Sequence, residues 1–282
     1  MPGTLFVVAT PIGNLEDISA RALRILREVA VIAAEDTRRT AQLLARYAIT
    51  TATTSLHEHN ENRKTASLVQ RLQRGEDVAL VSDAGTPTVS DPGQHLIRGA
   101  IDAGIRVEPI PGPSAALAAL AASGLPTGTF SFLGFPPTKA SDRSQWLDAL
   151  RTAGRTVVFF EAPHRIRQTL DEIIAAVGDR QIALGRELTK AHEEMVRGPI
   201  SVVLVSLREP RGEYTVVIDV GQMTDTGPLE RPNDSQIHVE FGELTNSGGH
   251  TRRGAVTALA RRYRLPAREV YAAIERARSS VE

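Results

Sequence analysis

Three short motifs that carry glycine and proline are placed to form a ligand site in this chain. They are Thr10-Pro-Ile-Gly-Asn14, Ser82-Asp-Ala-Gly-Thr-Pro87 and Pro111-Gly-Pro-Ser114, and each lies where an apolar strand pattern gives way to a helical pattern. In an open parallel sheet such loops gather at the carboxyl ends of the strands, where ligands bind. The motifs therefore predict a crevice for a small molecule.

The motifs do not favour a nucleoside triphosphate as the ligand. None of them matches G-x-G-x-x-G or G-x-x-x-x-G-K-[ST], and a proline removes one backbone donor from each loop. His57 and His59 lie beside Glu58 and Glu61, but no third cluster of metal ligands accompanies them. We therefore expect neither a phosphate cradle nor a metal site.

Strand and helix patterns alternate along the first part of the chain. The strand patterns lie at about 5–9, 29–34, 52–56, 78–82 and 106–110, and the helical patterns at about 15–28, 37–47, 61–74, 91–103 and 114–122. Such alternation implies parallel strands joined by crossover helices. Residues 1–122 are therefore predicted to form an N-terminal α/β domain, with these candidate helix caps: Asn14 or Asp17, Thr37, Asn60, and Ser90 or Asp91.

A second α/β domain is predicted over residues 129–220, after a short linker at 123–128. Its strand patterns lie at 130–134, 156–160, 181–187, 194–197 and 213–219, with helical patterns at 141–152 and 163–177 and an apolar segment at 200–207. Residues 221–250 lose periodicity and collect Gly, Pro, Asn, Asp and Ser, which is typical of a flexible linker. Residues 251–282 are then predicted to form a basic tail with two short amphipathic helices, which would make either a helix-turn-helix or a dimerisation hairpin.

The composition is that of an enzyme expected in the cytoplasm. The 282 residues include no cysteine, so disulfides and thiolate chemistry are excluded, and neither a signal-peptide pattern nor a membrane-length apolar run is found. The net charge is zero, yet residues 251–282 hold eight arginines against three glutamates, a net of +5. This imbalance favours a polyanionic partner, and the alternative is a solvated arginine-rich helix pair.

Several segments together resemble the tetrapyrrole methylase family. They are residues 5–18, 33–38, 80–87, 91–93 and 110–115, and the resemblance extends over about 4–220 and returns at 252–276. It implies a two-domain α/β fold of the tetrapyrrole-methylase type, a methyltransferase fold outside the Rossmann class, with a small C-terminal helical appendage. Within the family, Glu35-Asp-Thr-Arg38, His57-Glu-His-Asn60 and Gly185-Arg-Glu-Leu-Thr-Lys190 most resemble members that methylate the 2′-hydroxyl of a decoding-centre cytidine in 16S ribosomal RNA.

The resemblance implies S-adenosyl-L-methionine as the cofactor. This molecule carries no phosphate, so its site needs close backbone approach, hydrogen-bond acceptors and an apolar adenine slot. We expect it in the crevice between the domains, bound by Pro11, Gly13, Asn14, Ser82, Asp83, Ala84, Gly85, Pro113, Ser114 and Ala115, and covered by Leu133, Phe135, Glu213 and Tyr214.

Transfer of a methyl group to a ribose hydroxyl is an in-line displacement that requires positioning and a proton acceptor. The candidate catalytic residues are Glu35, Asp36, Arg38, Glu161, Arg186, Glu187 and Lys190, with His57, His59 and His164 as further possibilities. Arg38, Arg186 and Lys190 could instead hold RNA phosphates. The candidate RNA-binding residues are Arg165, Arg252, Arg253, Arg261 and Arg262.

The predicted function is 2′-O-methylation of 16S ribosomal RNA, as naked RNA or within the small ribosomal subunit. One alternative is a family member that acts on a tetrapyrrole or another small molecule, although the basic tail and the Glu35–Arg38 and His57–Asn60 segments have no obvious use there. Another is a ribosome-binding protein that has lost catalysis, although the intact set of loops argues against it. Because its relatives form dimers, the chain is expected to be a homodimer.

Overall fold

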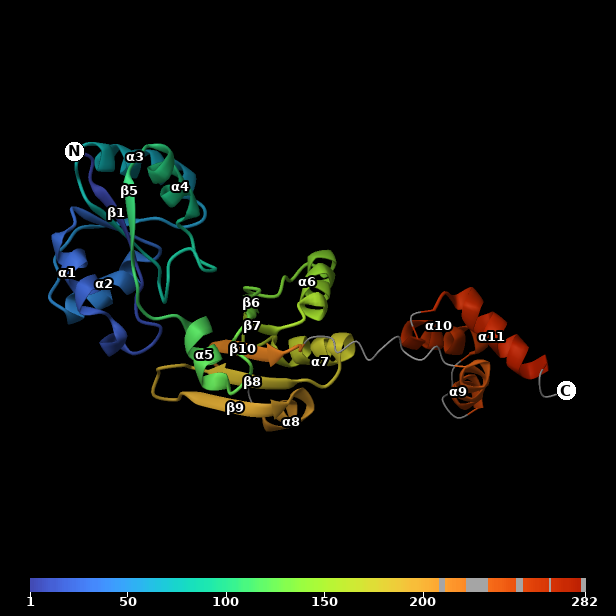
Figure 1. The fold of residues 1–282 in the computed structure, drawn as a ribbon. Helices are drawn as coiled ribbons and strands as arrows, with labels where there is room; N and C mark the ends of the chain where they lie inside the picture. The colour runs from blue at the N-terminus through green and yellow to red at the C-terminus, as the bar shows by residue number, and fades with distance from the viewer. Residues whose placement is uncertain (208–210, 222–232, 247–250, 264, 280–282) are drawn as a thin grey trace. The chain divides into compact units, whose positions relative to one another are not determined.

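The computed structural model describes residues 1–207, 211–221, 233–246, 251–263 and 265–279. It divides into two compact units, Met1–Gly221 and Gln222–Glu282 (Figure 1). Within the described residues, no helix combines the length and the apolar character that crossing a membrane requires.

The first unit begins with a parallel five-stranded sheet. Its strands are β1 (Thr4–Val8), β2 (Val31–Ala34), β3 (Thr53–Ser55), β4 (Val78–Val81) and β5 (Arg106–Ile110), in the order β3-β2-β4-β1-β5. Val81 is the register partner of both Val8 and Ala34, so β1, β2 and β4 end level with one another. This register brings the loops that follow the three strands to one edge of the sheet. Pro109 lies on β5, an edge strand, where its missing N–H costs little.

Helices cover both faces of this sheet, so the side chains of the central strand β4 are all buried. Residues of α1 (Ala20–Glu28) and α2 (Thr37–Arg46) pack on one face, and residues of α3 (Glu61–Gln73) and α4 (Gln94–Asp102) pack on the other. The predicted helix at 15–28 is instead a short 3-10 turn, η1 (Leu15–Asp17), followed by α1. Ile18 and Ser19 are extended between them, and the Ser19 side chain caps α1. Asp36, rather than Thr37, caps α2.

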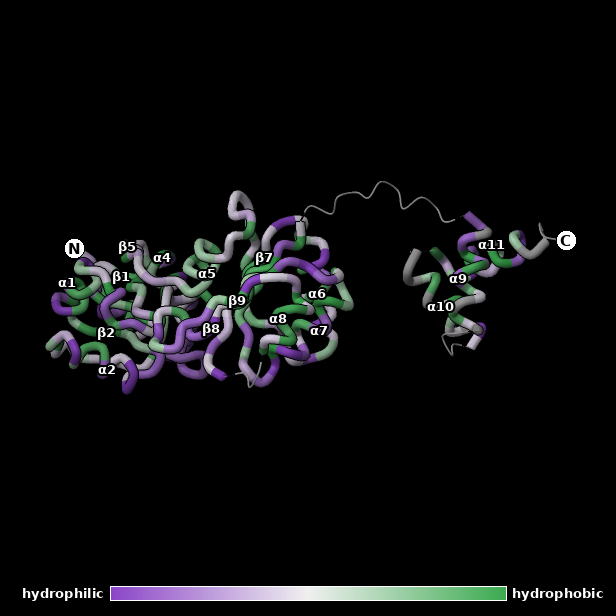
Figure 2. The backbone as a smooth tube through the Cα atoms, turned by 90° about the horizontal axis from the view of Figure 1, so that it is seen from below, coloured by the Kyte–Doolittle hydropathy of each residue, from purple (hydrophilic) through white to green (hydrophobic). Residues whose placement is uncertain are grey.

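The second half of the unit is a mixed five-stranded sheet. Its strands are β6 (Phe130–Phe132), β7 (Thr156–Glu161), β8 (Gln181–Arg186), β9 (Glu194–Pro199) and β10 (Tyr214–Asp219), in the order β6-β7-β10-β8-β9. Only the β6–β7 pair is parallel. Residues of α6 (Ala140–Thr152), α7 (Ile166–Val177) and α8 (Ile200–Ser206) pack on one face. In Figure 2, β7 and α8 are largely green, in keeping with their apolar sequences.

The helix α5 (Ala115–Ser123) packs on the other face of the second sheet, although the sequence pattern placed it in the first domain. Its small side chains Ala116 and Ala119 lie against Val158, Ala183 and Val217. A boundary drawn by packing therefore precedes α5 instead of following residue 122. The expected linker at 123–128 is tied to the second sheet, since Arg197 donates to the carbonyls of residues 122 and 123 and the Thr156 hydroxyl to that of residue 126.

The second unit contains three helices, α9 (Asp234–Asn246), α10 (Arg252–Tyr263) and α11 (Ala267–Ser279). They share a core to which Ile237, Phe241, Leu259 and Ile274 belong. The prediction of a flexible linker over 221–250 is therefore wrong for 234–246, because apolar residues there recur at helical spacing between polar ones. Residues 222–232 and 247–250 lie outside the described residues. Residues 222–282 contain nine arginines and eight acidic residues, so the net charge of this unit is +1, whereas that of residues 251–282 alone is +5.

Candidate functional site

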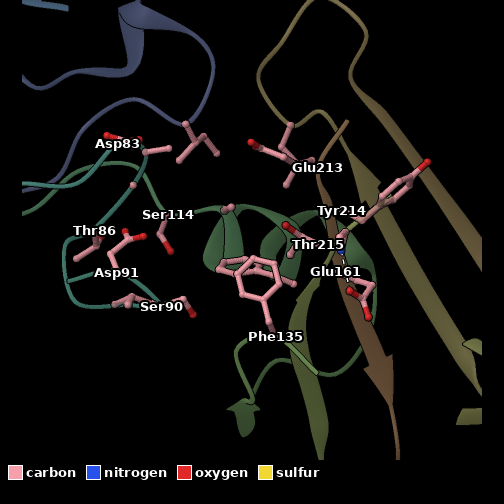
Figure 3. A pocket seen from close by; sticks show the side chains of 18 of the residues that line it. Asp83, Thr86, Ser90, Asp91, Ser114, Phe135, Glu161, Glu213, Tyr214 and Thr215 are labelled. Carbon is pink, nitrogen blue, oxygen red and sulfur yellow. Dashed lines mark hydrogen bonds between the residues drawn. The ribbon is translucent and has the colours of Figure 1, made fainter. Parts of the chain in front are cut away.

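A cavity of about 400 Å³ lies in the first unit, where loops of the first sheet meet the second sheet (Figure 3). Its volume suits a small ligand. The loops after β2 and β4 and the start of α5 form one side, and residues of the second sheet form the other. The lining residues are Ile12, Glu35, Arg39, Asp83, Ala84, Gly85, Thr86, Val89, Ser90, Asp91, Ser114, Ala115, Phe135, Phe160, Glu161, Ala162, Pro163, Leu188, Glu213, Tyr214 and Thr215.

The loops after β2 and β4 brace each other at the cavity. The Asp83 N–H donates to Glu35 Oε2 at 3.3 Å, and the Asp36 N–H donates to Asp83 Oδ1 at 2.9 Å. An Arg39 guanidinium nitrogen lies 3.4 Å from Asp83 Oδ2. Because β2 and β4 are hydrogen-bonded neighbours, their carboxyl ends bring these groups within reach. The brace fixes two carboxylates on the cavity wall.

Asp91 adds a third carboxyl to the same wall. Burial, together with the negative charges of Glu35 and Asp83, raises the pKa of Asp91 to about 6, although a hydrogen bond with Ser82 acts in the opposite direction. Burial also raises the pKa of Glu35; the hydrogen bond from the Asp83 N–H acts against this effect, and the negative charge of the Asp83 carboxylate adds to it. A carboxyl whose pKa lies near neutrality, as that of Asp91 does, suits proton transfer at the pH of a cell.

The loop that carries Asp91 has a strained backbone, and its end is fixed by hydrogen bonds to a residue of α3. Thr88 and Ser90 have φ angles of 72° and 67°, which L-residues rarely adopt. The loop ends at Gly93, whose N–H donates to Oε1 of the buried Glu61 at 3.0 Å, and the N–H of His95 donates to the same oxygen at 2.7 Å. Glu61 thus caps α4 and fixes the end of the loop.

Ten of the predicted site residues line the cavity. Eight were predicted to contact the cofactor, and two to be catalytic. They are Asp83, Ala84, Gly85, Ser114, Ala115, Phe135, Glu213, Tyr214, Glu35 and Glu161. Gly85 has a φ of 87°, which L side chains rarely adopt, so the backbone favours glycine at this position.

Two of these ten present little more than backbone to the cavity. Tyr214 is 3% exposed, its ring packs in the core beside α6 and α7, and Figure 3 shows it pointing away. The Glu161 carboxylate is fully buried and accepts hydrogen bonds from the Ala162 N–H, the Thr169 hydroxyl and the Arg165 guanidinium. Glu161 is therefore a poor candidate for a base, and Arg165, predicted to bind RNA, is its ion-pair partner.

Other predicted residues lie beside the cavity without lining it. Pro11 and Ser82 line a neighbouring cavity of about 270 Å³ that shares Arg39 and Asp83 with the main one. Gly13, Asn14 and Lys190 line a further cavity, where a Cβ on Gly13 would lie 2.8 Å from Thr189 Oγ1.

The remaining predicted residues also serve local structure. The Pro113 carbonyl accepts a hydrogen bond from the Thr86 hydroxyl, and that of Leu133 accepts one from Trp146. Asp36 caps α2, and its hydrogen bonds with Arg38 lower the pKa of Asp36 to about 2, which makes it a weak base. Most of the Arg38 side chain is exposed.

Charged residues predicted from the Gly185–Lys190 motif form ion pairs. Arg186 pairs with Glu194 at 3.0 Å. Lys190 Nζ lies 3.0 Å from Glu187 Oε1 and 3.1 Å from Glu213 Oε2. Arg186, Glu187 and Lys190 are absent from the cavity wall, so the Lys190 ammonium contributes by holding Glu213, which does line it.

The predicted RNA-binding arginines of the tail belong to α10. Arg252 is exposed on this helix. The side chains of Arg253, Arg261 and Arg262 lie outside the part of the structure that is described. Among the described residues, no group of three or more histidine, aspartate or glutamate side chains is arranged to hold a metal ion.

Sequence reasoning missed half of the cavity wall. Asp91, Thr86 and Ser90 lie in segments that the motifs included, but the pattern assigned Ser90 and Asp91 to a helix cap. Arg39 adjoins the predicted Arg38, and only the phase of α2 distinguishes them. The other missed residues are Ile12, Val89, Phe160, Ala162, Pro163, Leu188 and Thr215.

Comparison with known proteins identifies the family. A family model described as Tetrapyrrole (Corrin/Porphyrin) Methylases matches residues 4–203. The chain belongs to the tetrapyrrole methylase family. It is accordingly a methyltransferase, and the resemblance predicted from the sequence motifs is confirmed.

This tetrapyrrole methylase is similar to two proteins named ribosomal RNA small subunit methyltransferase I. The one from Halalkalibacterium halodurans is 42% identical over 271 residues, which cover 95% of this chain and 93% of the relative. The one from Pseudomonas aeruginosa is 50% identical over 221 residues, which cover 77% of this chain and 78% of the relative.

Solved structures confirm the predicted fold of the tetrapyrrole methylase unit. The uroporphyrin-III C-methyl transferase from Thermus thermophilus, complexed with S-adenyl homocysteine, is 18% identical with a TM-score of 0.54, and the match covers 77% of this chain and 98% of that one. A diphthine synthase is 16% identical with a TM-score of 0.58, and the match covers 77% of this chain and 90% of that one.

Proposed function

We propose that the chain methylates the 2′-hydroxyl of a cytidine in the decoding centre of 16S ribosomal RNA, with S-adenosylmethionine as the methyl donor. The observation that carries the proposal is the cavity wall with its two carboxyls of raised pKa, Glu35 and Asp91, in a chain whose relatives are named ribosomal RNA small subunit methyltransferase I. The resemblance of the Glu35–Arg38, His57–Asn60 and Gly185–Lys190 segments to members that methylate this cytidine supports the choice of target.

The lining of the cavity fits S-adenosylmethionine. The acidic side chains of Glu35, Asp83, Asp91 and Glu213 outnumber the guanidinium of Arg39, which suits a ligand with a sulfonium and an ammonium group. Carboxylates also accept hydrogen bonds from a ribose diol. The apolar side chains Ile12, Val89, Phe135 and Leu188 offer contact to an adenine.

The chain itself must orient the ribose and accept its proton. S-adenosylmethionine supplies a methyl group that its sulfonium has already activated. We assign the proton of the 2′-hydroxyl to the Asp91 carboxylate, with Glu35 as its electrostatic neighbour. These carboxyls lie on the loops after β2 and β4, which hydrogen bonds hold together. Little reorganisation of the site is therefore needed when the substrate binds.

The RNA itself is proposed to contact cationic groups at the rim of the cavity and beyond it. Arg38 and Arg39 are exposed at the start of α2, close to Asp83. Arg252, Arg253, Arg261 and Arg262 of the tail supply further positive charge, although the acidic residues of α9 offset it within the unit. Phosphate contacts of this kind position RNA and weaken as salt rises.

The test is a methylation assay with mapping of the product. The protein is incubated with radiolabelled S-adenosylmethionine and small ribosomal subunits from cells that lack the enzyme, and also with naked 16S RNA. We expect one labelled ribose in the decoding centre and at least a hundredfold loss of rate in Asp91→Asn. Label on a base, or label only on a tetrapyrrole offered in parallel, would contradict the proposal.

A further inference from the structure

Phe135 presents an unusual aromatic surface to the cavity. Its residue is 52% exposed although it lines the cavity wall. Its ring centroid lies 5.4 Å from that of Phe160, which in turn lies 5.0 Å from that of Phe132. Figure 3 shows the Phe135 ring between Asp91 and Thr215. One side of the ring is thus supported by protein, and the remainder is open to a ligand.

The backbone just after Phe135 is held by two arginines. The Arg165 guanidinium donates to the Pro136 carbonyl, and Arg143 NH1 donates to the Pro137 carbonyl at 3.1 Å. The two prolines have restricted φ angles and no N–H of their own. Hydrogen bonds to their carbonyls therefore fix this segment after Phe135, and the carbonyls of Leu133 and Gly134, which accept from Trp146 Nε1 and the Phe160 N–H, fix it before Phe135.

The buried Glu161 and the partly exposed Glu172 fix the two arginines in turn. Arg165 Nε lies 3.2 Å from the fully buried Glu161 carboxylate, and Glu161 also accepts the Thr169 hydroxyl at 2.6 Å. Thr169 Oγ1 accepts from Arg143 NH2 at 2.7 Å, and Arg143 Nε lies 2.5 Å from Glu172. A continuous network therefore joins β7, α6 and α7 to the segment that carries Phe135.

We propose that Phe135 is a stacking platform for a nucleobase and that Arg143 is a positioning residue that fixes this platform. The inference rests on the proposed function, which brings two bases to the cavity: the adenine of the cofactor and the cytosine of the target nucleotide. Both offer the π-face that an exposed phenyl ring recognises, and stacking tolerates either.

The buried network supports a positioning role over a purely stabilising one. Arg143 has only 12% of its side chain exposed, and taking paired charges out of water is costly compared with apolar packing. Its guanidinium uses Nε, NH1 and NH2 on three separate acceptors. A lysine keeps the charge but not this fork geometry, so Arg143→Lys should release the Pro137 carbonyl.

The first experiment measures binding of S-adenosylhomocysteine, which lacks the sulfonium charge, by calorimetry to the full chain. We expect Phe135→Leu to weaken binding about 5- to 100-fold and Phe135→Tyr to restore it, if the stacked base is the adenine. If the stacked base is the target cytosine, binding stays unchanged and the single-turnover rate on small subunits falls by a similar factor at saturating cofactor. Loss of neither quantity would overturn the inference.

The second experiment is a double-mutant cycle between Arg143→Lys and Phe135→Leu, with unfolding followed in parallel. Arg143→Lys should reproduce part of the Phe135→Leu effect and add nothing in the Phe135→Leu background. The matched control is Arg151→Lys, on the same helix and exposed in a pair with Asp148, which should leave affinity and rate unchanged. An additive effect of Arg143→Lys would overturn its positioning role.

The two proposals fail in distinguishable ways. Wild-type protein that binds S-adenosylhomocysteine through Phe135, yet leaves small subunits unmethylated, would contradict the proposed function and support the stacking platform. A wild type that methylates the cytidine, with a Phe135→Leu variant that does so at the same rate and with the same cofactor affinity, would support the proposed function and overturn the platform.

Discussion

The replacement Asp91→Asn tests both the charge and the chemistry of the cavity. Asp91 has a pKa of about 6 in the folded chain against an ordinary value of 3.8, chiefly because burial disfavours its ionised form. The folded state therefore binds the proton more tightly than the unfolded state. Above pH 6 the ionised carboxylate lowers the free energy of unfolding, and this cost disappears as the pH falls below 3.8.

The size of the effect follows from the same pKa difference. A shift of this kind corresponds to about 3 kcal/mol if it is carried in full, and solvent that reaches the cavity reduces it to about 1–2 kcal/mol. Asparagine keeps an oxygen for the Ser82 hydroxyl and carries no charge. We therefore expect Asp91→Asn to be more stable than the wild type by about 1–2 kcal/mol at pH 7.5, and by about half as much at pH 5.

The assay is urea unfolding of both proteins at pH 7.5 and pH 5, combined with single-turnover methylation. Stability should rise in the variant while the methylation rate falls about 10²- to 10⁴-fold, because the proton acceptor is gone. Asp102→Asn, an exposed carboxyl on α4 paired with Arg98, is the control and should change stability by less than about 0.5 kcal/mol. The reasoning would be refuted if Asp91→Asn were less stable than the wild type, or if the difference in their free energies of unfolding were the same at both pH values.

Three further predictions concern the loop, the pH profile and the assembly. The methylation rate should rise with pH and level off above about 6, as Asp91 ionises, and a flat profile from pH 5 to 8 in single turnovers would rule out this base. Glu61→Ala should lower the free energy of unfolding by about 2–4 kcal/mol, because it leaves the N–H groups of Gly93 and His95 without an acceptor. Glu61→Gln keeps an acceptor oxygen and should lower the free energy of unfolding by less than half as much. Equal losses for the two variants in urea unfolding would contradict the role of Glu61 as a cap. Light scattering at micromolar concentration should return about twice the 30.4 kDa chain mass if the predicted homodimer forms, and a monomer mass would exclude it.

The sequence was a good guide to the first sheet and its loops. Apolar runs between helical patterns located all five strands, and parallel pairing then brought the three motifs to one edge. Gly85 could be singled out because its turn demands a positive φ, which few other residues adopt. The predicted contacts at Asp83, Ser114 and Ala115 follow from this topology alone, and all three line the cavity.

Side-chain direction was the information that the sequence lacked. All but the last residue of β10 is buried, so no alternation of polar and apolar side chains shows that Thr215 faces the cavity and Tyr214 the core. Glu161 lies at the end of a strand, a position that is typical of catalytic acids. Its carboxylate is instead saturated by hydrogen-bond donors from α7 and the turn before it, and the sequence does not show that these donors reach it. The helix α9 was missed because its apolar residues are few and its neighbours are rich in turn formers.

The central place of β10 in the second sheet has a consequence for synthesis of the chain. All strands of the first sheet lie within the first 110 residues, so this part can fold while the ribosome is still adding the rest. The second sheet stays divided until β10 enters between β7 and β8, and β10 is its last strand to emerge.

Glu213 and Thr215, which β10 and its approach deliver, also line the cavity. A nascent chain that stops short of Tyr214 should therefore hold a folded first sheet but no complete cavity wall. Under the proposed function, a chain can therefore bind the cofactor only after it has been translated through β10.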